Sequence, residues 1–214
     1  MKIILFLVFL FLTYCFIGNL FSRGGNSFDM YIGVPGSGKT TLAAYFTRKR
    51  LKKVKKKKCS GTVLCNVPIK GAYKVEKSDI GHFMIKDKLL LIDEAGLDYD
   101  NRNFKSFSKE EIYFYKFHRH YNVDVKLFSQ DFDVDVKLRK LCTRLFIVNK
   151  SFIPGFIKTQ EIEKYIGINE TTHQLEDQYR FKLFGLRLYY IPKLWKMFNT
   201  LDRKELPIKE WEKY

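Results

Sequence analysis

The eight residues GVPGSGKT, at positions 33–40, constrain the fold of this chain more than any other feature. They match the pattern G-x-x-x-x-G-K-[ST] of phosphate-binding loops. Glycines in such a loop allow backbone angles that a side chain would forbid, so its N–H groups can surround phosphate oxygens. Residues 28–33 are typical of a strand, and the residues after Thr40 favour a helix. The sequence therefore predicts a strand, a phosphate loop and a helix in that order.

Each polar residue of this loop has an expected role. Lys39 supplies a mobile cation to the β- and γ-phosphates, and the Thr40 hydroxyl can join the shell of a Mg²⁺ ion. We therefore expect ATP and Mg²⁺ as cofactors. The predicted nucleotide contacts are Gly33, Val34, Pro35, Gly36, Ser37, Gly38, Lys39, Thr40 and Thr41.

A second motif, KLLLIDEAG at positions 88–96, consists of an apolar run followed by two carboxylates. It predicts a buried parallel strand that delivers Asp93 to its C-terminal edge, where ligands gather in open α/β sheets. Asp93 is expected to hold Mg²⁺, and Glu94 to polarise the attacking water as general base. This pair favours ATP hydrolysis over a small-molecule kinase, which must exclude water. The alternative is a solvated acidic turn after a core strand.

Guanine recognition of the usual type requires N-K-x-D, and the segment NKSF at positions 149–152 has Phe152 in place of the aspartate. Adenine is therefore favoured, although no residue reads it positively. The four cysteines and four histidines show no metal-ligand spacing, and free thiols are the simplest interpretation.

Strand and helix patterns alternate along the rest of the chain to position 150. Strands are expected at 61–68, 123–130 and 143–149, and helices at 108–122 and 134–142. The helix at 108–122 opens with a capping-box pattern, Ser108 with Glu111. Such alternation predicts an α/β fold, a P-loop NTPase with a mostly parallel sheet flanked by helices, over residues 25–150.

Gln130 ends one of these strands near the expected γ-phosphate, where it could sense phosphate, orient water or simply cap a loop. In a ring of subunits, an arginine could also reach a neighbour's γ-phosphate. The arginines that follow the acidic strand are Arg102, Arg119, Arg139 and Arg144, of which Arg102 and Arg139 are the preferred candidates. For any single one of them, the alternative is a solvated or structural arginine.

The N-terminal residues 3–22 carry no charge. Twenty helical residues span about 30 Å, the thickness of a hydrocarbon core, which predicts a transmembrane helix over residues 1–24. A cleaved signal peptide is disfavoured, because the apolar run is long and no small-x-small cleavage site follows. About five residues separate this helix from the first strand, so we expect the ATPase domain to lie against the cytoplasmic face of the membrane.

The chain has a formal net charge of +16, and nine of the eleven residues at 48–58 are cations. This basic run is expected to continue the helix after the phosphate loop and to end in a mobile loop. It could bind nucleic acid or anionic lipid, or be merely solvated. Residues 151–214 form a C-terminal extension, in which the segment 179–192 suggests a β-hairpin around Gly185 or an amphipathic edge.

The ordered motifs FDMYIGVPGSGKTTLA, VLCNVP, LLLIDEAG, FHRHYNVDVKLFSQDFDVDVKLRKL and TRLFIV resemble the N-terminal domain of the Zot (zonular occludens toxin-like) family over about residues 28–150. This is the assembly ATPase family of filamentous phages, related in fold to DNA-pumping ATPases. The resemblance implies a ring-forming homo-oligomer in the host inner membrane that helps to extrude single-stranded phage DNA, with other phage assembly or coat proteins as partners. Lys39, Thr40, Asp93 and Glu94 match its nucleotide motifs, and Gln130 and Arg139 its downstream polar positions.

Many members of that family place the membrane helix after the ATPase domain, whereas this chain is expected to have it before. An alternative function is a membrane-surface regulatory or scaffolding NTPase that binds anionic lipid and has no role with DNA.

Overall fold

The computed structural model describes residues 6–7, 9–11, 13–14, 26–95, 108–130, 136–168 and 175–198. The elements are β1 (Phe28–Ile32), α2 (Lys39–Lys55), β2 (Val63–Cys65), β3 (Tyr73–Lys74), η1 (Lys77–Asp79), β4 (Leu89–Ile92), α4 (Lys109–Phe117), β5 (Asp124–Ser129), α5 (Val136–Leu141), β6 (Arg144–Lys150), β7 (Phe156–Ile168), β8 (Leu175–Tyr190) and η2 (Leu194–Met197). The strands and helices expected between residues 28 and 150 are found, with ends that differ by a few residues.

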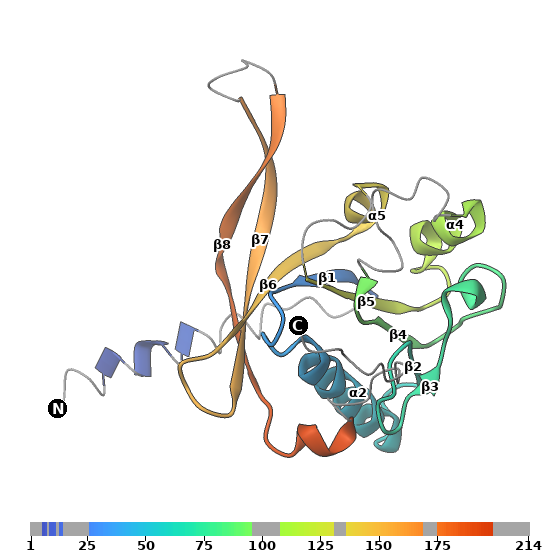
Figure 1. Ribbon diagram of the computed structural model, residues 1–214, viewed down its shortest axis with the longest axis horizontal. Coiled ribbons are helices and arrows are strands. Elements are labelled where there is room, and N and C mark those ends of the chain that lie inside the picture. The colour runs from blue at the N-terminus through green and yellow to red at the C-terminus, as the bar shows by residue number, and fades with distance from the viewer. Residues whose placement is uncertain are drawn as a thin grey trace, which may run out of the picture.

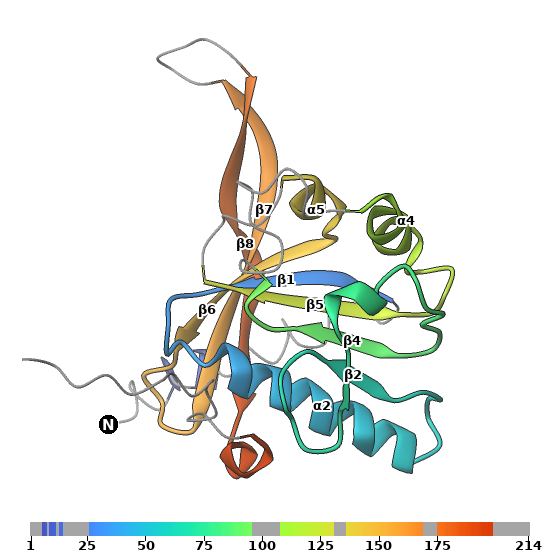
Figure 2. The same cartoon turned by 45° about the vertical axis from the view of Figure 1, so that its right-hand side comes forward.

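The eight strands form one sheet in the order β3-β2-β4-β5-β1-β6-β7-β8. The pairs from β3 to β6 are parallel, and β7 and β8 extend the sheet with antiparallel pairs. Helix α2 covers one face of the sheet, and α4 and α5 cover the other (Figures 1 and 2). This arrangement confirms the predicted α/β fold with a mostly parallel sheet. Strands β1 and β4 are buried at every position because both of their faces are covered, and β4, with the sequence LLLI, is a continuous apolar run.

The core has two halves, because side chains of a strand alternate between the two faces of the sheet. Met30 of β1 packs with Phe114 and Tyr115 of α4. The next residue, Tyr31, packs on the α2 face, with its ring centroid 5.2 Å from that of Phe128 and 4.8 Å from that of Phe146.

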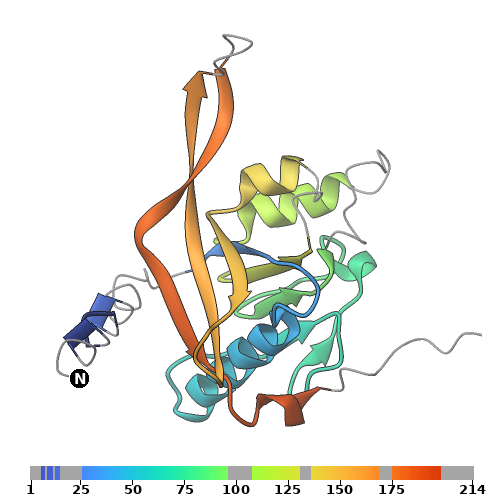
Figure 3. The same ribbon diagram turned by 60° about the vertical axis from the view of Figure 1, so that its left-hand side comes forward.

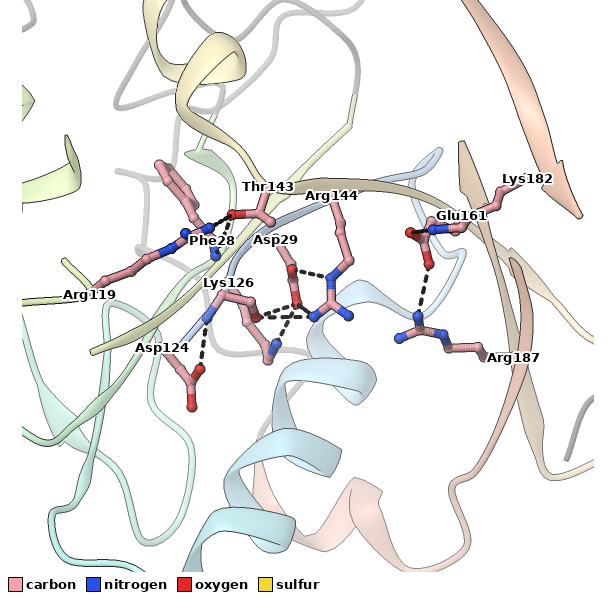
Figure 4. Close-up of polar contacts among 11 residues, drawn as sticks. Phe28, Asp29, Arg119, Asp124, Lys126, Thr143, Arg144, Glu161, Lys182 and Arg187 are labelled. Carbon is pink, nitrogen blue, oxygen red and sulfur yellow. Dashed lines mark hydrogen bonds and ion pairs between the residues drawn. The ribbon is translucent and has the colours of Figure 1, made fainter. Parts of the chain in front are cut away.

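An ion-pair network lies across the central strands. The fully buried carboxylate of Asp29 accepts hydrogen bonds from Lys126 Nζ at 2.8 Å and from Arg144 Nε and Nη2 at 2.8 Å each (Figure 4). Burial alone would raise the pKa of Asp29, but the two cations outweigh it and hold this pKa below its ordinary value. The network therefore links β1 to both of its neighbours, β5 and β6.

One expectation for local structure is confirmed and another needs correction. Helix α2 runs to Lys55, and residues 56–58 follow it as a turn, so the basic run at 48–58 continues the helix and then leaves it, as expected. Gly185 is not the turn of a hairpin but lies inside β8, which pairs with β7 over almost its whole length. The long β7–β8 hairpin projects from the body (Figure 3). The predicted boundary at residue 150 lies between β6 and β7, which are neighbours in one sheet.

Three of the four cysteines, Cys59, Cys65 and Cys142, lie in the described part of the chain, and all three are free thiols, as expected. Most of the predicted transmembrane helix at 1–24 lies outside the described residues. Within the residues that the structure describes, no helix has both the length and the apolar character needed to cross a bilayer.

Candidate nucleotide-binding site

Three neighbouring parallel strands end at one edge of the sheet. Strand β5 lies between β1 and β4, so Gln130 follows it at a point between the phosphate loop and Asp93. The amide of Gly33 donates a hydrogen bond to the Ser129 carbonyl at 3.1 Å. The fold thus brings the two predicted nucleotide motifs and Gln130 to one edge, as expected for a ligand site in an α/β sheet.

Two of the glycines in the phosphate loop show why side chains are excluded there. A Cβ atom on Gly33 would lie 2.6 Å from the Val148 carbonyl oxygen, a backbone atom of β6. Gly38, the N-cap of α2, has a φ of 101°, which L side chains rarely adopt. The loop therefore packs tightly against the sheet and turns sharply into the helix, which aims the first N–H groups of α2 at the site. The hydroxyl of Ser37 beside it is buried and has no hydrogen-bond partner in the described structure.

Lys39 turns back over its own loop. Its Nζ donates to the Gly33 carbonyl at 2.6 Å and to the Val34 carbonyl at 3.2 Å, and the residue is only 7% exposed. Phosphate oxygens bind an ammonium ion more strongly than backbone carbonyl oxygens do. The Lys39 ammonium group thus lies at the phosphate loop, and its role with the nucleotide stays a prediction.

Thr40 and Asp93, the two residues predicted to hold Mg²⁺, are in direct contact. Thr40 Oγ1 donates to Asp93 Oδ2 at 2.6 Å, although the two residues are 53 positions apart. Burial raises the pKa of Asp93, while the hydrogen bonds from Thr40 and from the Glu94 amide act to lower it. A hydroxyl and a buried carboxylate at one place form a donor set that suits Mg²⁺, so the residues fit the expected ion.

Asn66 completes this corner, although sequence reasoning assigned it no role. Its Oδ1 accepts from the Asp93 amide and its Nδ2 donates to the Asp93 carbonyl, both at 2.8 Å. The two bonds fix the peptide on either side of the Asp93 Cα atom from a position just beyond β2. In the sequence, the only indication of this role was that Asn66 is a polar residue at the end of the strand in VLCNVP, which is β2 and pairs with β4.

Glu94 and Gln130 are the exposed members of the edge. Glu94 has a φ of 54°, and its amide donates to Asp93 Oδ1 at 3.1 Å. A left-handed conformation at a residue with a side chain is uncommon and costs about 1–3 kcal/mol. Glu94 is exposed to solvent directly after the buried Asp93.

The candidate arginines lie elsewhere. Arg139 is on α5, which precedes β6, so it lies at the edge of the sheet opposite the phosphate loop. Arg144 is bound to Asp29 and stabilises the sheet, and Arg119 Nη2 donates to Thr143 Oγ1 at 3.2 Å (Figure 4). Arg102 falls outside the described residues. The structure therefore separates Arg139 from the nucleotide edge of its own subunit.

Arg139 lines a cleft of about 870 Å³ at that opposite edge. The described lining contains seven basic residues and only the carboxylates of Glu161 and Glu163. The Glu161 carboxylate forms ion pairs with Lys182 and Arg187, each at 2.8 Å. The Nε of Arg139 is buried without a hydrogen-bond partner in the described part of the chain. The cleft is therefore a concave, cationic surface.

Known proteins similar to this chain share its fold. The family model for zonular occludens toxin (Zot) matches residues 44–151, half of the chain. The N-terminal domain of zonular occludens toxin from Neisseria meningitidis is 16% identical, with a TM-score of 0.57 over 82% of this chain and 100% of that domain. No curated protein matches the sequence.

Two further structures have lower TM-scores. The genome packaging NTPase B204 from Sulfolobus turreted icosahedral virus 2, in complex with ATP-gammaS, is 12% identical, with a TM-score of 0.46 over 75% of this chain and 100% of that one. The flagellar accessory protein FlaH from Methanocaldococcus jannaschii is 12% identical, with a TM-score of 0.42 over 78% and 92%.

The family model and the toxin domain cover the part of the chain that carries the acidic motif and the strands around it. The phosphate loop at 33–40 lies just before the matched residues and leads into helix α2, most of which the match includes. This chain therefore belongs to the zonular occludens toxin (Zot) family, as a P-loop NTPase.

Proposed function

We propose that this protein is a membrane-anchored, oligomeric ATPase that drives DNA export during phage assembly at the host inner membrane. The observation that carries the hydrolytic part is the contact of Thr40 with Asp93 and the exposed Glu94 next to it. Those three groups provide a place for Mg²⁺ and a carboxylate for water at one edge of the sheet.

Each group at this edge has a role in hydrolysis. The loop amides and Lys39 bind the phosphates, and Thr40 and Asp93 would hold Mg²⁺, which offsets the negative charge of the phosphate oxygens when bound. Glu94 accepts a proton from the attacking water, because its carboxylate is exposed beside Asp93. Gln130, at the end of the strand between them, orients that water or contacts the γ-phosphate.

Arg139 supports a role for a second copy of the chain. It lies at the opposite edge of the sheet, in the cationic cleft, and its buried Nε lacks a partner among the described residues. A head-to-tail ring places one edge of each subunit against the other edge of its neighbour. In such a ring, Arg139 would stabilise the charge that develops on the neighbour's γ-phosphate.

The membrane and DNA parts of the proposal have separate support. The uncharged residues 3–22 are long enough to cross a bilayer, and the family to which the chain belongs suggests a role in phage assembly. The net charge of +16 suits a polyanionic substrate. Binding of anionic lipid by a regulatory NTPase is the alternative that an experiment must separate.

The test uses the full chain in lipid nanodiscs and measures ATP hydrolysis with and without circular single-stranded DNA. We expect DNA to raise the rate, and Glu94→Gln to lower it by about 10²- to 10⁴-fold, the usual contribution of a general base. Mixing Glu94→Gln with Arg139→Ala subunits should restore part of the activity if Arg139 acts between subunits. A rate that responds to anionic lipid but not to DNA would favour the regulatory alternative.

A further inference from the structure

A pocket of about 550 Å³ lies where the end of β8 meets helix α2, away from the nucleotide edge and from the cationic cleft. The α2 residues in it stand at positions 45, 48, 49 and 52, a spacing that places them on one face of the helix. We call this site the α2 pocket. Its lining consists of two tyrosines, four cations and one proline: Tyr45, Arg48, Lys49, Lys52, Tyr190, Pro192 and Lys193.

The fold holds the β8 side of the α2 pocket in place. Ile191 and Leu194 are buried in the core half that contains α2, and the Ile191 amide donates to the Gly155 carbonyl at 2.9 Å. Lys193, between them, has a φ of 65°, and residues held in this left-handed conformation cluster at ligand sites. The start of η2 therefore fixes Tyr190 and Lys193 beside α2 (Figure 1).

The cations of the α2 pocket are not neutralised by the protein. None of the described residues that line it is acidic. Arg48 Nη1 donates only to the Pro192 carbonyl, at 3.5 Å, and within the described part of the chain Lys49, Lys52 and Lys193 form no ion pair. Burial and the charges of nearby cations lower the pKa of Lys49. An anion in the pocket would relieve this repulsion.

An exposed aromatic ring completes the α2 pocket. Tyr190 is 62% exposed, and its ring is supported by Phe156, with centroids 5.2 Å apart. The basic run at 48–58 contains no aromatic residue, so only the fold brings tyrosine beside it. Cations next to an open ring match a nucleotide unit, whose phosphate binds the cations while its base stacks on the ring.

We propose that the α2 pocket binds single-stranded DNA, with phosphates on the cations of α2 and a base stacked on Tyr190. This inference rests on the proposed function in DNA export and names the surface at which the chain holds that substrate. A single strand fits better than a duplex, because a duplex keeps its bases stacked inside, away from the tyrosine.

The length of the basic surface favours a strand over a free nucleotide. Cations continue along α2 from Arg48 to Lys55, which at 1.5 Å per residue is about 10 Å, beyond the reach of one phosphate group. A lipid surface fits less well, since it is flat and offers no ring to stack in a concave pocket. The described features of the α2 pocket therefore suit a polynucleotide chain.

The experiment measures binding of a fluorescent oligothymidine, by anisotropy, to the full chain in nanodiscs of phosphatidylcholine, which has no net charge. Tyr190→Ala should weaken binding by about fivefold to a hundredfold, the usual loss of one base–aromatic stack, whereas Tyr190→Phe should bind like the wild type. The control is Tyr113→Ala, because Tyr113 is 57% exposed, also contacts a phenylalanine and lies on α4, which covers the other face of the sheet. It should bind like the wild type.

A salt titration tests the phosphate contacts. Lys52→Ala should reduce the slope of log K against log salt by about 0.7, the value for one phosphate contact on a single strand, whereas Tyr190→Ala should leave the slope unchanged. Lys116→Ala, another exposed lysine on α4, is the control and should keep the wild-type slope. Each variant should hydrolyse ATP at the wild-type rate without DNA, which shows that it is folded.

The outcomes separate this inference from the proposed function. If the wild type binds the oligonucleotide and DNA stimulates its ATP hydrolysis, but Tyr190→Ala and Lys52→Ala bind equally well, the inference alone is overturned. If these variants keep oligonucleotide binding but lose a response of ATP hydrolysis to phosphatidylglycerol, the pocket is a lipid site and the inference is again wrong. A wild type that neither binds nor responds to DNA would overturn the role in DNA export, and this inference with it.

Discussion

Asn66→Ala tests how far the geometry of Asp93 depends on a residue that touches no expected ligand. The substitution removes two hydrogen bonds of 2.8 Å to the backbone of Asp93. At about 1 kcal/mol net for each bond, the free energy of unfolding should fall by about 2 kcal/mol. For a chain of this size, that loss corresponds to a decrease in Tm of about 4–8 °C.

The effect on hydrolysis should exceed the effect on binding. Asn66 holds the backbone of Asp93 in place. Without Asn66, the Asp93 carboxylate can move relative to Thr40 and Glu94. A displacement of about 1 Å at a catalytic group can reduce the rate by about 10²-fold. The phosphate loop is built by other residues, so the Kd for ATP should change much less than kcat.

The assay combines a thermal melt, titration with a fluorescent ATP analogue and steady-state hydrolysis. Asn26→Ala is the control, because Asn26 donates one hydrogen bond to Asn122 at the opposite edge of the sheet. A folded Asn66→Ala protein with the wild-type kcat would refute the reasoning. Equal losses in both variants would mean that the effect is general instability.

Three further predictions concern the structure that supports the site. Gly33→Ala should lower the free energy of unfolding by about 1–3 kcal/mol in urea titrations, because the new Cβ meets the Val148 carbonyl oxygen; an unchanged midpoint would contradict this packing. Asp29→Asn should lower the free energy of unfolding by about 3–5 kcal/mol in the same titrations, since it leaves Lys126 and Arg144 without their carboxylate. A decrease below about 1 kcal/mol would show that these ion pairs contribute little to stability. Burial lowers the pKa of His118, so its contribution to stability is complete above a pH of about 6.5 and is lost as the pH falls toward the folded pKa. Unfolding at several pH values should show this loss in the wild type, whereas His118→Gln should lack that part of the pH dependence.

The local parts of the fold could be predicted from the sequence. The phosphate loop, the strand before Asp93 and the capping box of α4 each depend on neighbouring residues, and each is present in the structure. The capping box even has both expected hydrogen bonds between Ser108 and Glu111, at 2.8 and 3.1 Å. The C-terminal ends of parallel strands lie at the same edge of a sheet, so the proximity of Thr40 and Asp93 could also be predicted from the sequence pattern.

The remaining features depend on which strands become neighbours. Asn66 reaches Asp93 only because β2 pairs with β4, and Arg139 lies away from the nucleotide edge only because α5 precedes a strand parallel to β1. The register shift at residues 182–185 of β8, opposite Glu161, depends on the pairing with β7, which begins about twenty residues before β8. No spacing in the sequence encodes these pairings, and Gly185 therefore suggested a turn where the chain continues as a strand.

The most direct test of the account asks which edge of the sheet binds the nucleotide, since the cationic cleft at the opposite edge also attracts phosphate. The affinity of Mg²⁺ and a non-hydrolysable ATP analogue is measured for the wild type, Lys39→Ala and Arg139→Ala at protein concentrations that keep the chain monomeric. The account predicts that Lys39→Ala weakens binding by about tenfold or more, as expected when a buried charge-assisted contact is lost, and that Arg139→Ala binds like the wild type. Loss of binding in Arg139→Ala, with Lys39→Ala unaffected, would contradict it.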